Sequence, residues 1–151
     1  MRFNVHIPLA AFLVLWAQPC LTQAGPAQAN VSHVEIERLR SDKGQVLCAL
    51  YSRLTAYPRT VRKRSHTRAS PISDNRASRE FSGVKPGMYT VSVFDDENSN
   101  GKLDTNLLGI PREGVGASND ATGHFGPPKF DDAAFQFSGG PLNLKITINY
   151  L

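Results

Sequence analysis

The chain has 151 residues, a formal net charge of +4 and only two cysteines, Cys20 and Cys48. This length suits a single domain, and so few cysteines exclude a small scaffold held together by several disulfides. The N-terminal residues have the composition of a segment that is removed from the mature protein, so the folded part is expected to be shorter than the chain.

A basic start at Arg2 precedes an apolar run over residues 7–17, and small residues lead up to Ala24 and Ala29. This layout predicts a secretory signal peptide over residues 1–29, cleaved after Ala29 or, in the alternative, after Ala24. An apolar run of roughly 11 residues is too short for a membrane span, which needs about 20. We therefore expect an exported protein, periplasmic or extracellular, with one domain over residues 30–151 and no transmembrane segment.

Charge is unevenly distributed along the exported part. Residues 53–79 include eight basic residues and one acid, Asp74. Residues 95–113 include five acids and two basic residues, Lys102 and Arg112. Clustered cations can contact phosphates, but the basic segment lacks interleaved aromatic residues, so nucleic acid is not an expected partner. A solvated loop is the simpler interpretation, and contact with anionic envelope polymers or lipid head groups is the alternative.

The first predicted strands are residues 31–39, where apolar and charged residues alternate, and residues 45–51. A turn at 42–44 separates them, which predicts a hairpin. In the second strand Val46, Cys48 and Leu50 share one face, so Cys48 is expected to be a small buried hydrophobe. Residues 53–82 show no sustained period and predict a long loop or irregular edge.

The next element is a strand over residues 88–94, which follows a Pro86-Gly87 turn and places Tyr89, Val91 and Val93 on one face. Residues 107–128 are rich in glycine and proline and predict a wandering surface loop. Alternation returns at residues 133–137 and 142–150. Every clear pattern has a period of two, with one apolar face, which predicts an all-β antiparallel sandwich of about seven strands.

Hard oxygen ligands are concentrated in residues 94–104. A calcium loop presents oxygens at positions 1, 3 and 5, a glycine at 6, a backbone carbonyl at 7 and another oxygen at 9. With Asp96 as position 1, the register gives Asn98, Asn100, Gly101, Lys102 and Asp104. Leu107 replaces the glutamate of position 12, so Glu113 or Asp95 would have to complete the shell. The sequence thus predicts a Ca²⁺ site formed by a set of six residues: Asp96, Asn98, Asn100, Lys102, Asp104 and Glu113.

Other interpretations of this loop remain open. Asn100-Gly101 is also a strong signal for a turn that needs no ion. A hydrolase would need two carboxyl groups about 5–10 Å apart, and Asp95, Asp104 and Glu113 could supply them. Phe125 and Phe130, beside the glycine-rich segment, suit a surface for glycans or small ligands of the cell envelope. The sequence favours a protein without enzymatic activity.

Four long motifs resemble those of a bacterial family: GVKPGMY at 83–89, FDDENSNGKLDTN at 94–106, GIPREGVGASN at 109–119 and GPPKFDDAAF at 126–135. The chain resembles the exported family called domain of unknown function 2141, with the weakest match between residues 53 and 82. That resemblance implies an exported single domain with an immunoglobulin-like or transthyretin-like sandwich, and it implies no activity. The loop also resembles the calcium loops of B-type repeats in bacterial surface adhesins, which implies that Glu113 is the remote ligand.

Overall fold

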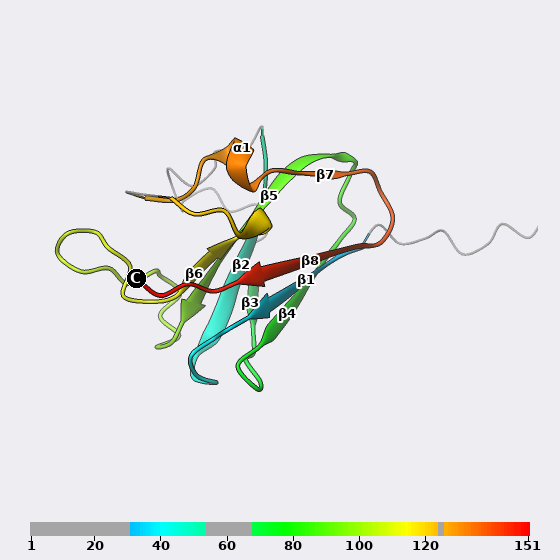
Figure 1. Cartoon of the computed structure of the whole chain (residues 1–151). Coiled ribbons are helices and arrows are strands. Elements are labelled where there is room, and N and C mark those ends of the chain that lie inside the picture. The colour runs from blue at the N-terminus through cyan, green and yellow to red at the C-terminus, as the bar shows by residue number, and fades with distance from the viewer. Residues whose placement is uncertain (1–30, 54–67, 124–125) are drawn as a thin grey trace, which may run out of the picture.

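The computed structural model describes residues 31–53, 68–123 and 126–151, and the regular secondary structure in these ranges is almost entirely β (Figure 1). The predicted signal peptide at 1–29 lies outside the described residues, as do the cations between 59 and 64. No helix in the described ranges is long and apolar enough to cross a membrane. The elements are β1 (Val31–Glu37), β2 (Gln45–Ser52), β3 (Arg68–Ser70), β4 (Ala77–Ser82), β5 (Gly87–Asp96), β6 (Val115–Ala117), the 3-10 helix η1 (Ser118–Asp120), α1 (Phe130–Ala133), β7 (Phe135–Phe137) and β8 (Leu142–Thr147).

These strands form two sheets, one of three strands in the order β4-β1-β8 and one of five. In the larger sheet the order is β3-β2-β5-β6, and β7 also pairs with β5. The expectation of purely antiparallel pairing is wrong at one place, because β1 and β8 run parallel, with Val34 opposite Leu144. The two arrows point the same way in Figure 1.

The two sheets share one hydrophobic core. Val34, Ile36 and Ile146 from the smaller sheet pack with residues of β2 and β5 from the larger sheet. The predicted faces are confirmed, because Val46, Cys48 and Leu50 all lie in this core, as do Val91 and Val93. Burying each large aliphatic side chain contributes about 1.5–3 kcal/mol. Burial also raises the pKa of the Cys48 thiol to about 12, which suits a packing role and not a nucleophile.

The predicted hairpin between the first two strands is wrong. β1 pairs with β4 and β8, and β2 pairs with β3 and β5, so the connection over residues 38–44 crosses from one sheet to the other. Leu39 donates its backbone N–H to the Asn75 carbonyl at 3.1 Å, which holds the connection beside the β3–β4 turn. Gly44, at φ +75°, lies against the backbone of Asp96 and leaves no room for a Cβ there. These contacts direct the chain away from β1.

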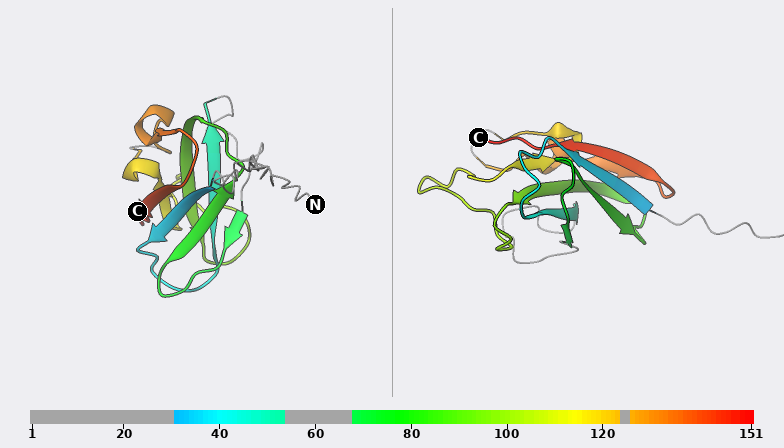
Figure 2. Two further views of the ribbon diagram at one scale, coloured as in Figure 1. Left: turned by 90° about the vertical axis from the view of Figure 1, so that its right-hand side faces the viewer. Right: turned by 90° about the horizontal axis from the view of Figure 1, so that it is seen from below.

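The prediction of an irregular segment over residues 53–82 is wrong for its second half. β3 and β4 lie there as edge strands of the two sheets (Figure 2). In β4, Ala77 and Phe81 are buried and Arg79 occupies the inward position between them. A charged residue at an inward position hides the period of two, which explains why the alternation was missed.

Among the described residues of the predicted loop over 107–128, the regular elements are the short β6 and η1, as the glycine and proline content of the segment indicates. The predicted strand at 133–137 is confirmed for Phe135–Phe137, whereas Ala133 ends the short helix α1. The last predicted strand is confirmed as β8, whose pattern continues to the buried Ile148.

Candidate cation-binding loop

The acidic loop follows strand β5 and therefore begins at one end of the larger sheet. Its last two residues, Asp95 and Asp96, are both fully buried and point to opposite faces because side chains alternate along a strand. Beyond them the chain projects as a long loop, drawn in yellow-green beside the C-terminus in Figures 1 and 2. The candidate site is therefore held by the most extensively paired strand in the described part of the chain.

Asp96 organises the first turn of the loop. Its Oδ1 accepts a hydrogen bond from the Asn100 backbone N–H at 2.9 Å, and its Oδ2 accepts one from Gly101 N–H at 2.9 Å. The Gln45 side chain on β2 donates to the same Oδ2 at 2.7 Å. Gly101 has φ +74°, a left-handed conformation that glycine adopts without strain.

Asp104 lies across the loop from Asp96 and is bound by side-chain amides. Asn98 Nδ2 donates to its Oδ2 at 2.7 Å, and Asn100 Nδ2 donates to its Oδ1 at 3.1 Å. The oxygens of the two amides accept backbone N–H groups, Asn100 N–H at 3.0 Å and Lys102 N–H at 2.7 Å. The Lys102 side chain is exposed. Residues at positions 1, 3, 5 and 9 of the predicted register thus surround one compact turn.

Glu113, remote in sequence, is brought to this turn. Its Oε1 accepts Glu97 N–H at 3.2 Å, and its Oε2 accepts Asp104 N–H at 2.9 Å. The side chain is 4 % exposed, and this burial raises the pKa of its carboxyl, with the Asp104 N–H bond acting in the opposite direction. The loop and the strand that follows it are therefore joined through one buried carboxylate.

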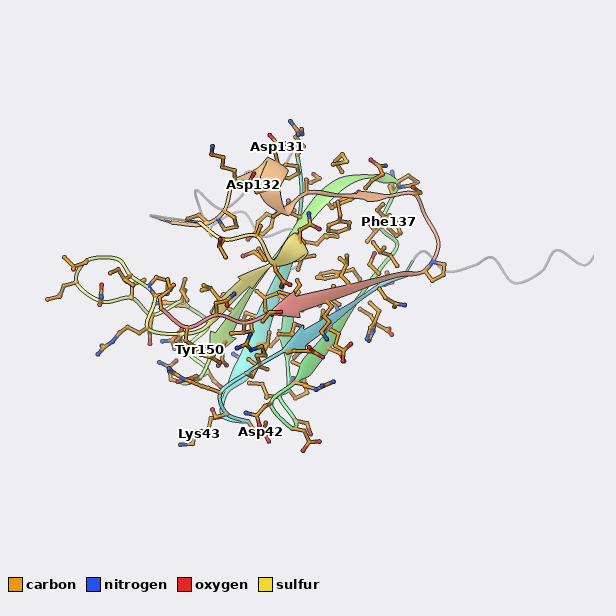
Figure 3. The ribbon with its side chains drawn as sticks, viewed as in Figure 1. Asp42, Lys43, Asp131, Asp132, Phe137 and Tyr150 are labelled. Carbon is orange, nitrogen blue, oxygen red and sulfur yellow. The ribbon has the colours of Figure 1, made fainter. Side chains whose placement is uncertain are left out.

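A second set of contacts stabilises the start of the loop through residues that the sequence analysis did not identify. Arg40 forms a two-pronged ion pair with Glu97 and places its guanidinium 4.6 Å from the centre of the Tyr150 ring. Through this pair the Glu97 carboxyl has a lowered pKa and the Arg40 guanidinium a raised one. Figure 3 labels Tyr150 near the base of the projecting loop.

Asp95 lies on the core side of β5 and contacts Tyr150, the aromatic residue of this set. It accepts a hydrogen bond from the Tyr150 hydroxyl at 2.6 Å, and its other oxygen, Oδ1, is buried with no partner among the described residues. Burial raises the pKa of the Asp95 carboxyl, and the Tyr150 bond opposes that shift. Since Asp95 faces the core side of β5 and Asp96 the other side, Asp95 does not join the loop residues.

The structure thus brings together Asp96, Asn98, Asn100, Asp104 and Glu113. Within the described ranges no three side chains of the His, Cys, Asp and Glu types are grouped so that they could hold a metal ion. Asp96 and Glu113 direct their oxygens to backbone N–H groups, and amide nitrogens lie against Asp104. Ion binding would therefore require the two asparagine amides to release Asp104.

The residues expected for the other functions lie in several parts of the chain, and one of them lies outside the described residues. Of the three carboxylates predicted for a hydrolase, Asp104 and Glu113 meet at the loop, whereas Asp95 lies opposite Val46 on the core side of β5. Phe125 lies outside the described residues, and the Phe130 ring is covered by the Arg53 guanidinium at 5.2 Å. Of the described loop residues, Leu107 and Leu108 are the most exposed apolar side chains.

Comparison with known proteins defines the family. Residues 34–145 match the model of a family described as uncharacterised proteins conserved in bacteria (DUF2141), and the chain belongs to this family. The match includes the whole acidic loop and Glu113. No curated protein and no solved structure matches the chain.

Proposed function

We propose that this protein is an exported, non-enzymatic domain with an immunoglobulin-like or transthyretin-like arrangement of its two sheets, and that its acidic loop binds Ca²⁺. The ligands would be Asp96, Asn98, Asn100, the Lys102 carbonyl, Asp104 and Glu113. The ion would order the neighbouring glycine-rich segment, and the domain would act at the cell envelope as a structural or binding module.

One observation carries this proposal: two buried carboxylates, Asp96 and Glu113, meet at one turn without a described basic side chain bonded to either of them. Buried carboxylates are costly unless they are paired or bind a cation. The Arg40 guanidinium nearby is already paired with Glu97. A divalent cation at the turn would supply the missing positive charge.

The amides of Asn98 and Asn100 support the same location. Their Nδ2 groups lie 2.7 and 3.1 Å from the Asp104 oxygens, where a cation would otherwise contact this carboxylate. Each amide also has an oxygen within the same turn, and Ca²⁺ accepts such neutral oxygens as ligands. Because two of the side-chain ligands are neutral amides, we expect micromolar to millimolar affinity and not the nanomolar affinity of buffer sites.

Glu113 connects the ion to the glycine-rich segment. Asp95 N–H bonds to Gly114 O at 2.9 Å and Arg112 N–H bonds to Asp104 O at 2.9 Å, so Glu113 sits where the returning chain meets β5. An ion held by Glu113 would fix the start of β6 relative to the loop. The expected role is thus to stabilise this end of the domain.

Isothermal titration calorimetry of the full chain with Ca²⁺ tests the proposal. We expect saturable binding, weakened about tenfold or more in Glu113→Gln because a charged ligand is lost. Glu80→Gln, which changes an exposed glutamate on β4, is the matched control and should bind as the original chain does. Absence of binding at millimolar Ca²⁺, or equal binding by Glu113→Gln, would refute the proposed site.

A further inference from the structure

A groove lies along the edge where β3 and β4 face each other, on a different part of the molecule from the acidic loop. Its volume is ≈ 750 Å³. Apolar side chains and cations both line it, among them Leu50, Phe81, Tyr89, Arg68, Arg79 and Lys85. We call it the β3–β4 groove.

The two arginines occupy inward positions on these edge strands. Arg68 is paired in register with Cys48, a core residue, so it lies on the core side of β3. Arg79 lies between the buried Ala77 and Phe81 on β4, and side chains alternate along a strand. Cations from both sheets are therefore directed toward one space.

Arg79 has an unsatisfied donor. Among the described residues its buried Nε has no hydrogen-bond partner, and the ion pairs formed by the described carboxylates do not include Arg79. Glu80, the acid that lines the groove, lies instead 3.8 Å from His33. A buried donor left unsatisfied is unfavourable, and more so when the group is charged.

A simpler role for an inward arginine is protection, since charges at such positions deter edge-to-edge pairing of strands. That role requires only one charge at the edge. It explains neither the presence of three cations around one hollow nor the apolar floor of Leu50, Phe81 and Tyr89. Guanidinium groups bind carboxylates and phosphates through paired hydrogen bonds, and an apolar floor favours an apolar ligand body.

We propose that the β3–β4 groove binds a small amphiphilic anion, with a carboxylate or phosphate head on Arg79 and Arg68 and an apolar chain against Phe81 and Tyr89. The proposal is independent of Ca²⁺ binding, because the groove shares no residue with the acidic loop. The two head groups present the same oxyanion chemistry to the arginines, and separate probes distinguish them.

The test is titration of the full chain with octanoate, octyl phosphate and inorganic phosphate, followed by calorimetry and by NMR shifts of groove residues. We expect saturable binding of octanoate or octyl phosphate, with weaker binding of inorganic phosphate. Arg79→Gln should weaken it by about tenfold or more, as expected for loss of a charged hydrogen-bond donor. The matched control is Arg112→Gln, an exposed arginine outside the groove, which should leave binding unchanged.

Arg68→Gln provides a second variant, because Arg68 is exposed and its loss should not disturb the core. It should also weaken binding, and the NMR shifts should map to β3 and β4. The proposal is overturned if no probe binds at millimolar concentration, if Arg79→Gln and Arg68→Gln bind as tightly as Arg112→Gln, or if the shifts map elsewhere.

Discussion

Asp95 lies in an environment that is unfavourable to its charge, because it is fully buried and one of its oxygens has no partner among the described residues. Its pKa in the folded chain is raised, chiefly by burial. The folded state therefore binds a proton more readily than the unfolded state does, so ionised Asp95 destabilises the fold above its folded pKa. That penalty disappears as the pH falls through the folded pKa toward the unfolded value of about 4.

Asp95→Asn should therefore stabilise the chain at pH 7. The amide keeps an oxygen to accept the Tyr150 hydroxyl, and it removes the buried charge. Urea unfolding from pH 4 to pH 8 should show the variant more stable than the original chain at pH 7, with the difference shrinking as the pH is lowered. Asp132→Asn, at an exposed carboxylate, is the control. A difference that stays constant with pH would contradict this account of Asp95.

Asn98 provides a second prediction at the scale of single residues. Asn98→Asp removes the 2.7 Å amide bond to Asp104 and places two carboxylates side by side. In chelator the variant should be less stable by about 1–2 kcal/mol, whereas its affinity for Ca²⁺ should rise because a charged ligand replaces a neutral one. Calorimetry and urea unfolding measure the two effects, with the exposed Asn143→Asp as control. Equal affinity in Asn98→Asp and the original chain would count against this ligand.

Among the elements, the returning chain at β6 packs closely on the C-terminal segment. A Cβ added at Gly114 would lie 2.4 Å from Ile148 Cγ2 and 2.6 Å from Tyr150 Cε1. Both neighbours are held in place, Ile148 by the core and Tyr150 by Asp95 and Arg40. The absence of a side chain at Gly114 lets Glu113 reach the loop.

Gly114→Ala should therefore destabilise the chain by about 1–3 kcal/mol, as overpacking does. Gly87→Ala is the matched control: its nearest neighbour would be the Tyr89 ring at 3.3 Å, so we expect a smaller loss. Thermal and urea unfolding compare the two variants. Equal stability of both would show that the C-terminal segment moves aside readily.

At the level of secondary structure, the buried faces of strands could be predicted from the sequence, but the pairing of strands could not. Alternation identifies which side of a strand is buried, and this was confirmed for β2, β5 and β8. It does not identify the neighbouring strand, so the parallel pairing of β1 with β8 was missed. The predicted hairpin is wrong because residues 38–44 contact the β3–β4 turn and the end of β5. Such long-range contacts cannot be predicted from the local turn sequence.

At the scale of the whole molecule, the residues of the candidate site could be predicted from the sequence, whereas the distant residues that hold the loop in place could not. The oxygen register from Asp96 to Asp104 is local, and the resemblance to adhesin repeats brought in Glu113, which the structure places at the turn. Gln45, Arg40 and Tyr150 were missed because they reach the loop from distant segments of both sheets. Nothing in their own surroundings in the sequence marks them.

The central claim is that this end of the domain is completed by Ca²⁺, and thermal unfolding of the full chain in Ca²⁺ and in chelator tests it most directly. At a Ca²⁺ concentration a hundred times Kd, binding adds about 2.7 kcal/mol, which corresponds to a Tm increase of roughly 10 °C. We expect that increase for the original chain and for Glu80→Gln, and its loss in Glu113→Gln and Asp96→Ala. The same Tm with and without Ca²⁺, or an equal increase in Glu113→Gln and Asp96→Ala, would contradict the account.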